Sequence, residues 1–223
     1  MIEFINVSKS FNNLEILKDF NITFKKNKIT CLFGPSGVGK TTIANIAANL
    51  IEIDSGSVNI TKEAAYSYVF QEPRLLDWYS VYDNIDFVLK NVYDNENRVN
   101  IINNYINMVE LTDYKNYKPN ELSGGMAQRV SLARAFAFPS NVLILDEPFK
   151  GLDLKLKREM ILLFKKLWNK SKRTVIFITH DVDEAVTLSD YIYFLNEKPA
   201  KVIDYIDILE YNDISEVKKL LDN

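Results

Sequence analysis

The sequence predicts an α/β fold built around a mainly parallel sheet. A continuous apolar run at 142–145 is typical of a strand that is covered on both faces, and 174–179 is predicted to be a second buried strand. Amphipathic stretches with helical spacing, such as 41–51 and 154–168, lie between or after such runs. Strands that alternate with helices favour a parallel sheet. We also expect a small antiparallel β subdomain and an inserted α-helical subdomain.

The first third of the chain reads as short strands, one loop and one helix. The predicted elements are strands 2–7, 20–24 and 28–33, helix 41–51, and strands 57–60 and 66–70. We expect a hairpin turn at Lys26-Asn27, because asparagine tolerates turn conformations, and a second turn at Asp54-Ser55-Gly56.

The rest of the chain begins with a helical stretch at 81–117 that is rich in Asn and Tyr. The later predicted elements are helix 124–138, strand 142–145, helix 154–168, strands 174–179, 191–195 and 201–206, and a short charged helix at 214–221. We therefore predict one domain over 1–223, with a core at 1–80 and 140–223 and a helical subdomain at about 81–139.

Composition narrows the class of protein. The 223 residues are 47% hydrophobic and 26% charged, which is usual for a globular protein. No stretch approaches the roughly 20 apolar residues that cross a bilayer, and Met1 leads into Glu3 rather than into a signal peptide, so we expect an intracellular protein. A net charge of −3 argues against nucleic acid as a partner. Cys31 is the single cysteine, so we expect a buried thiol and no disulfide framework.

One loop carries a specific signal for phosphate binding. The segment 34–41 reads GPSGVGKT and matches G-x-x-x-x-G-K-[ST] between a predicted strand and a predicted helix. Its backbone N–H groups and the helix N-terminus would hold phosphates, Lys40 would contact the β and γ phosphates, and Thr41 would offer a hydroxyl to Mg²⁺. By itself the motif predicts the fold of a P-loop NTPase that binds a nucleotide with Mg²⁺, and kinases, GTPases and helicases share it. The nucleotide-binding residues predicted here are Gly34, Pro35, Ser36, Gly37, Val38, Gly39, Lys40, Thr41 and Thr42.

Two further strand ends carry polar groups. Asp146 and Glu147 follow the apolar run 142–145, and His180, the only histidine, follows strand 174–179. Ligands gather at the carboxyl ends of parallel strands. We expect Asp146 to hold Mg²⁺, Glu147 to orient or deprotonate the attacking water, and His180 to reach the γ-phosphate. From the residues alone, His180 could equally be an ordinary surface or core histidine.

A third motif resembles that of a known protein family. Leu122-Ser123-Gly124-Gly125-Met126, followed by Ala127-Gln128-Arg129, resembles the signature motif of ABC transporter ATPases. The other elements of that family occur in order over nearly the whole chain. They are Phe11, the P-loop, Gln71, Asp146-Glu147, Lys150-Gly151-Leu152-Asp153 and His180. Met126 stands where Gln is commoner, and KGLD replaces SALD, but neither change removes a catalytic group.

The resemblance implies a head-to-tail dimer that holds ATP between the P-loop of one subunit and the signature motif of the other. It places Ser123, Gly124 and Gly125 against the partner's nucleotide, with Asp153 acting across the dimer. It also implies that Phe11 stacks on adenine and that Gln71 contacts Mg²⁺ and the water. The alternative for Phe11 is a core aromatic residue after the first strand.

The segment 70–78, with 147–153, resembles the importer branch that serves nitrate, sulfonate and taurine. In that group the stretch after Gln71 lies beside the membrane subunit, so Leu75, Leu76 and Trp78 form either a docking face or part of the interior of the helical subdomain. The expected partners are a second ATPase subunit, membrane permease subunits and a solute-binding protein. The expected location is the cytoplasmic face of the cell membrane.

Three alternative functions can be compared with this pattern. An ATPase of an exporter or a lipid-release complex would carry the same motifs. An ABC ATPase that acts away from membranes would have two ATPase halves or long coiled-coil insertions, and this sequence has neither. A module that binds nucleotide without hydrolysing it would lack the base that we assign to Glu147.

Overall fold

The computed structural model describes residues 1–60, 64–211 and 217–218, which fall into two compact units. The first unit comprises Met1–Tyr66, Asn141–Glu147 and Lys172–Asn223, and the second comprises Ser67–Ser140 and Pro148–Ser171. The second unit thus includes residues 67–80 and 148–171, which the sequence assigned to the core.

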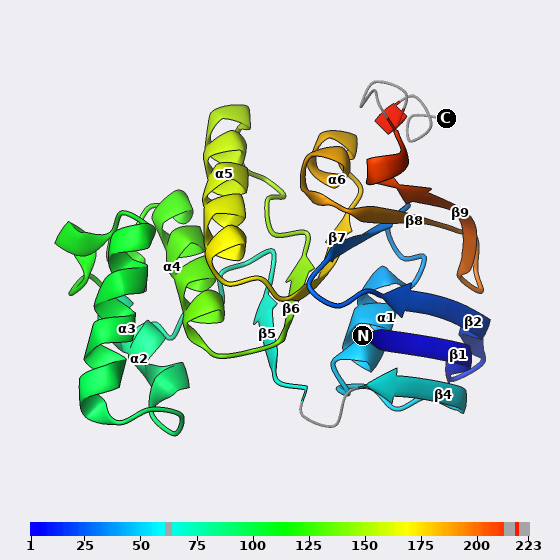
Figure 1. Cartoon of the computed structure of the whole chain (residues 1–223), viewed down its shortest axis with the longest axis horizontal. Helices are drawn as coiled ribbons and strands as arrows, with labels where there is room; N and C mark the ends of the chain where they lie inside the picture. Colours follow the sequence, from blue (N-terminus) through cyan, green and yellow to red (C-terminus); the bar gives the residue numbers. More distant parts are fainter. Residues whose placement is uncertain (61–63, 212–216, 219–223) are drawn as a thin grey trace. The chain divides into compact units, whose positions relative to one another are not determined.

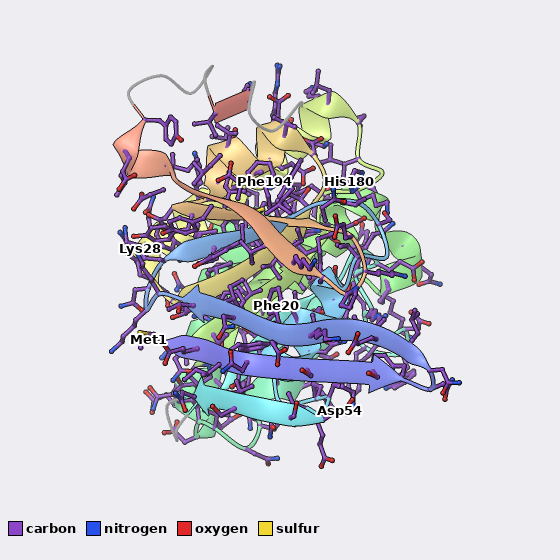
Figure 2. The ribbon with its side chains drawn as sticks, turned by 90° about the vertical axis from the view of Figure 1, so that its right-hand side faces the viewer. Met1, Phe20, Lys28, Asp54, His180 and Phe194 are labelled. Carbon is purple, nitrogen blue, oxygen red and sulfur yellow. The ribbon has the colours of Figure 1, made fainter. Side chains whose placement is uncertain are left out.

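The first unit contains a small antiparallel sheet. Its strands, β1 (Ile2–Phe11), β2 (Leu14–Phe24) and β4 (Ser55–Ile60), follow the order β2-β1-β4 (Figure 1). Figure 2 shows them side by side, with Asp54 at the start of β4. The ammonium of Lys9 lies 2.7 Å from a carboxylate oxygen of Asp54, which ties β1 to the start of β4. The antiparallel subdomain predicted from the sequence is confirmed.

The larger sheet of the first unit is mainly parallel, as predicted. Within this unit β3 (Ile29–Phe33), β6 (Val142–Asp146), β7 (Thr174–Thr179), β8 (Tyr191–Asn196) and β9 (Lys201–Asp207) follow the order β6-β7-β3-β8-β9. The first four of these are parallel, and β9 runs antiparallel to β8. All six residues of β7 are buried, which is why this strand reads as one apolar run.

The hairpin predicted at Lys26-Asn27 is wrong. β2 pairs with β1 in the small sheet, whereas β3 pairs with β7 and β8 in the large one. Asn27 has a left-handed backbone (φ 56°), and its N–H donates to the Thr174 hydroxyl at 3.1 Å. The predicted turn therefore transfers the chain between two sheets instead of pairing its flanking strands.

The turn predicted at 54–56 is also wrong at Gly56, which lies inside β4. Pairing of β1 with β4 shifts register between Ile5 and Ser8. At this irregularity Gly56 has φ 89°, and a Cβ there would collide with the carbonyl oxygen of Asn6. The strand can begin at Ser55 because glycine allows this close backbone approach.

Two helices of the first unit contact its parallel strands. Figure 1 shows α6 (Val182–Leu188) above and α1 (Lys40–Ala47) below the ribbons of β7 and β3. The sequence analysis did not identify α6, which has only seven residues. A short turn of 3₁₀ helix, η3 (Ile208–Glu210), follows β9. The helix predicted at 214–221 lies outside the described residues except for positions 217–218.

The second unit is helical. It holds α2 (Val81–Leu89), α3 (Asn95–Met108), α4 (Gly124–Ala137), α5 (Leu154–Lys170), and the 3₁₀ turns η1 (Thr112–Tyr114) and η2 (Pro119–Glu121). The strand β5 (Tyr66–Val69) leads into it from the first unit. Ser80 and Asp94 cap α2 and α3 by accepting backbone N–H groups, so the predicted stretch 81–117 divides into separate helices.

Packing in the second unit joins α4 to α5. The rings of Phe136 and Phe164 meet at 5.8 Å in an edge-to-face arrangement, and both side chains are fully buried. In the part of the chain that the structure describes, no helix combines the length and the apolar character needed to cross a membrane.

The close approach at Gly56 gives a test of the fold. We expect Gly56→Ala to lower the free energy of unfolding by about 2–4 kcal/mol, because the new methyl group meets backbone and the residue keeps a positive φ. Urea denaturation measures the loss. Gly124→Ala is the matched control, since no atom lies within 4 Å of the Cβ it would add. A Gly56→Ala protein as stable as the control would contradict this reading of β4.

Candidate active site

The phosphate loop lies where the motif predicts, between β3 and the start of α1. Gly39 caps α1 with φ 120°, and Gly37 has φ 81°, so two turns of the loop use backbone that favours glycine. A Cβ on Gly34 would collide with the carbonyl oxygen of Leu195. The backbone of Leu195 thus packs tightly against the loop, and the N-terminus of α1 favours an anion.

Lys40 is folded over this loop. Its ammonium donates hydrogen bonds to the carbonyl oxygens of Gly34 at 2.7 Å and Pro35 at 2.8 Å, and the residue is only 5% exposed. The long side chain therefore returns to the loop that precedes its own helix. This arrangement places the Lys40 side-chain nitrogen directly beside the loop.

A pocket of about 190 Å³ opens beside the loop. Its lining residues in the first unit are Ile16, Ser36, Gly37, Gly39, Lys40, Thr41, Thr42, Glu147 and Ile178. Basic, hydroxyl, amide and carboxylate groups thus face one space, with two isoleucines at its apolar side.

Two oxygen groups meet at the edge of the parallel sheet. The Thr41 hydroxyl, on the first turn of α1, donates to Asp146 at the end of β6, with distances of 3.1 and 3.4 Å to the two carboxylate oxygens. A hydroxyl and a carboxylate at this separation suit Mg²⁺, which takes oxygen ligands and keeps waters and phosphate oxygens in its remaining positions.

Glu147 and His180 meet at the ends of β6 and β7. Nδ1 of His180 lies 3.3 Å from Oε1 of Glu147, and the side chains of His180 and Glu147 are 50% and 13% exposed respectively. The backbone of Glu147 is left-handed (φ 47°), and its N–H donates to the carbonyl oxygen of Ile178 at 3.0 Å. Such a conformation is uncommon for a residue with a side chain.

A buried pair that the sequence analysis missed supports the position of His180. The Thr179 hydroxyl donates to Glu184 at 2.7 Å and accepts the N–H of Asp181 at 3.1 Å. Asp181 in turn caps α6 by accepting the N–H of Glu184 at 3.0 Å. The signal was present as Asp-x-x-Glu at the start of a helix, although the helix itself was too short to be recognised.

The remaining predicted polar residues belong to the second unit. The Ser123 hydroxyl accepts the N–H of Met126 at 3.3 Å, and Asp153 accepts the N–H of Leu156 at 3.0 Å, so these residues cap α4 and α5. Ser123, Gly124 and Gln71 are not buried, whereas Gly125 is buried against Leu156. The first unit therefore gathers Lys40, Thr41, Asp146, Glu147 and His180, while Gln71, Ser123, Gly124, Gly125 and Asp153 lie in the second.

Phe11 lies at the end of β1. Its side chain is 43% exposed, with the Lys9 ammonium 5.4 Å from the ring centroid. The alternative that Phe11 is a core aromatic residue is wrong, because the ring faces solvent.

The loop after Gln71 is held from within the second unit by two residues that the sequence analysis did not select. Buried Asn84 accepts the N–H of Leu76 at 2.9 Å and donates to the carbonyl oxygens of Leu76, Tyr79 and Ser80. The guanidinium of Arg134 donates to the carbonyl oxygens of Pro73 and Arg74, both at 3.1 Å. The only signals were a polar residue within a helical pattern and a basic residue on α4.

Trp78 follows this loop and is 68% exposed, so the alternative that it is packed inside the helical subdomain is wrong. Leu75 and Leu76 are partly buried. Of the three residues predicted to form a docking face, Trp78 presents the most apolar surface to solvent.

Comparison with known proteins identifies the family. The family model described as ABC transporter matches residues 17–150. The chain belongs to the ABC transporter family. Among curated relatives of this ABC protein is an aliphatic sulfonates import ATP-binding protein, SsuB, of Bacillus cereus. It is 36% identical over 208 residues, which cover 90% of this chain and 81% of that protein.

The sulfate/thiosulfate import ATP-binding protein CysA of Mannheimia succiniciproducens is 37% identical over 217 residues. That match covers 91% of this ABC chain, which spans 61% of the length of the relative. Among solved structures, the dimeric, post-hydrolysis ATP-binding cassette MJ0796 bound to ADP and Pi matches with a TM-score of 0.80 and 28% identity. The match covers 93% of this chain and 99% of that one. The predicted P-loop NTPase fold is confirmed as that of an ATP-binding cassette.

The Thr179–Glu184 hydrogen bond yields a prediction with a control on the adjacent strand. We expect Thr179→Val to lower the free energy of unfolding by about 1–3 kcal/mol, because a buried carboxylate loses a donor. Thr30→Val is the control, since the buried Thr30 hydroxyl makes no hydrogen bond among the described residues, and a methyl group should fit at no cost. The measurement is thermal unfolding of both variants. Equal falls in their unfolding midpoints would contradict the stabilising role of the Thr179–Glu184 hydrogen bond.

Proposed function

We propose that this chain is the ATP-binding and ATP-hydrolysing subunit of an ABC transporter that imports a small solute. The observation that carries the proposal is the convergence, at one edge of the parallel sheet, of the Lys40 loop, the Thr41–Asp146 pair and the Glu147–His180 pair. A phosphate cradle, oxygen ligands for Mg²⁺ and a base are the three requirements of ATP hydrolysis by water.

Binding begins with the triphosphate. Loop N–H groups and the N-terminus of α1 receive phosphate oxygens, and Lys40 exchanges its loop carbonyls for the β and γ phosphates. Exposed Phe11 offers a flat face on which adenine can stack. We assign nucleotide binding to the whole motif from Gly34 to Thr42.

Mg²⁺ would be held by Thr41 and Asp146, with Gln71 as a further ligand that also contacts the water. When bound, the ion neutralises charge that develops on the phosphate oxygens. The 3.1 Å separation of hydroxyl and carboxylate supports this assignment, because it places two oxygen ligands close together beside the phosphate loop.

Hydrolysis requires an activated water. Glu147 takes a proton from that water while the oxygen of the water bonds to the γ-phosphorus. The bond between the γ-phosphorus and the oxygen that bridges to the β-phosphate breaks. The products are ADP and inorganic phosphate. His180 is within hydrogen-bonding distance of Glu147 and is assigned to the γ-phosphate. The strained backbone of Glu147 turns this carboxylate toward the pocket that it lines.

A second copy would complete each site. We propose that Ser123, Gly124 and Gly125 bind the γ-phosphate of the partner's ATP, and that Asp153 acts across the same dimer. Ser123 and Gly124 are accessible at the N-terminus of α4, where N–H groups and the helix dipole favour an anion. The structural neighbour MJ0796 is dimeric with ADP and Pi bound.

The relatives direct the proposal toward import. Their names specify import of aliphatic sulfonates and of sulfate or thiosulfate. We propose that the whole chain works as a single ATPase domain at the cytoplasmic face of the membrane, with permease subunits and a solute-binding protein as partners. Nitrate, sulfonate and taurine are the solutes suggested by the segment 70–78. Trp78 and the partly buried Leu75 and Leu76 would face the permease.

The assignment of the base predicts the behaviour of one variant. Glu147→Gln should lower the ATP turnover number by at least about 100-fold, because the amide cannot accept the proton of water. ATP binding should persist, and the dimer should accumulate with ATP in size-exclusion chromatography. Glu52→Gln changes an exposed carboxylate outside the pocket and is the control. Parental turnover in Glu147→Gln would disprove the role of Glu147.

The direction of transport has a separate test. We expect the genes beside this one to encode a permease and a solute-binding protein, and we expect the purified permease to raise ATP turnover by this chain. A neighbouring permease gene without any binding-protein gene would count against import. Coupling can be measured as phosphate release with and without the permease in vesicles.

A further inference from the structure

A second lysine lies beside the phosphate loop and is not part of any motif identified above. A Cβ built on Gly37 would lie 3.8 Å from the ammonium nitrogen of Lys198. Lys198 belongs to the turn between β8 and β9 (residues 197–200, the β8–β9 turn), about 160 residues after the loop. The sequence pattern gave no reason to connect the two segments.

The β8–β9 turn is fixed against the loop by backbone. The N–H of Ala200 donates to the carbonyl oxygen of Ile16 at 2.7 Å, and residues 17 and 200 form an isolated bridge. A Cβ on Gly39 would lie 3.6 Å from the Cβ of Ala200. At the other end of the turn, Leu195 touches Gly34 closely enough to exclude a side chain there. The position of Lys198 beside Gly37 therefore follows from contacts on both sides of it.

The charges around this turn leave the Lys198 ammonium available to an anion. The neighbouring carboxylate, Glu197, lies 3.7 Å from the ammonium of Lys201 in an exposed pair. Within the described residues no ion pair involves Lys198, which is itself exposed. Lys40, by contrast, is buried and already engaged by two carbonyl oxygens. The loop therefore has two lysines of different character: Lys40 is buried and bonded to loop carbonyls, whereas Lys198 is exposed beside Gly37.

We propose that Lys198 is a second cationic contact for the phosphate chain of the bound nucleotide. The inference rests on the proposed function, since it requires that the loop bind nucleoside phosphates. Gly37 lines the pocket, so an anion seated over the loop lies within the reach of the flexible Lys198 side chain. Lys198 contributes affinity through charge and takes no part in proton transfer.

The experiment measures ATP and ADP affinity by calorimetry at several salt concentrations. We expect Lys198→Gln to weaken both affinities about three- to tenfold at low salt, and by less at high salt, because an exposed charge is screened. Lys198→Arg should restore most of the loss. Lys26→Gln removes the same charge from an exposed site at the opposite end of β3 and should leave affinity unchanged.

The outcomes separate this inference from the proposed function. The role of Lys198 alone would be overturned if the wild-type chain binds nucleotide in a way that depends on Lys40, and Lys198→Gln has the same nucleotide affinity and salt dependence as the wild type. Equal losses in Lys198→Gln and Lys26→Gln would also overturn it, because the effect would then reflect net charge. Absence of nucleotide binding by the wild-type chain would overturn the proposed function and this inference together. Circular dichroism of each variant establishes that it is folded.

Discussion

The hydrogen bonds from Lys40 to the carbonyl oxygens of Gly34 and Pro35 are the interaction on which the site depends. They turn the carbonyl oxygens of Gly34 and Pro35 toward the lysine that follows them, at the helix N-terminus where an anion is favoured. The loop can close in this way because Gly34, Gly37 and Gly39 adopt backbone conformations or contacts that a side chain would prevent. The other polar residues that line the pocket lie beside this closed loop.

The parallel sheet supplies the remaining groups by a single rule. β3, β6 and β7 run in the same direction, so the loop, the pair Asp146-Glu147 and His180 all emerge at one edge. This rule also explains why the residues that we propose as catalytic are far apart in sequence and yet lie within hydrogen-bonding distance in pairs. The supporting bonds, such as that from Thr179 to Glu184, lie one residue further back in the strands, where the environment is dry.

Prediction from sequence succeeded where a pattern is local. The buried runs of β6 and β7 and the phosphate loop were visible because burial on both faces and anion binding each impose a short, continuous requirement on the residues. It failed at Asn27, where the same turn chemistry serves either a hairpin or a passage between sheets, and only the partner strands decide. It also missed α6 and Asn84, because a seven-residue helix and a single buried amide leave no period to detect. The place of Lys198 beside Gly37 depends on tertiary contacts and had no sequence signal at all.

At position 147 a relaxed backbone and a carboxylate side chain cannot be had together, because the backbone of Glu147 is left-handed. Glycine or asparagine would relax this conformation, but neither has a carboxylate. Random substitution followed by selection for heat resistance would therefore favour changes at position 147 that remove the carboxylate, whereas selection for the proposed ATP hydrolysis would retain it. A more stable protein that lacks this carboxylate is thus one or two nucleotide changes away.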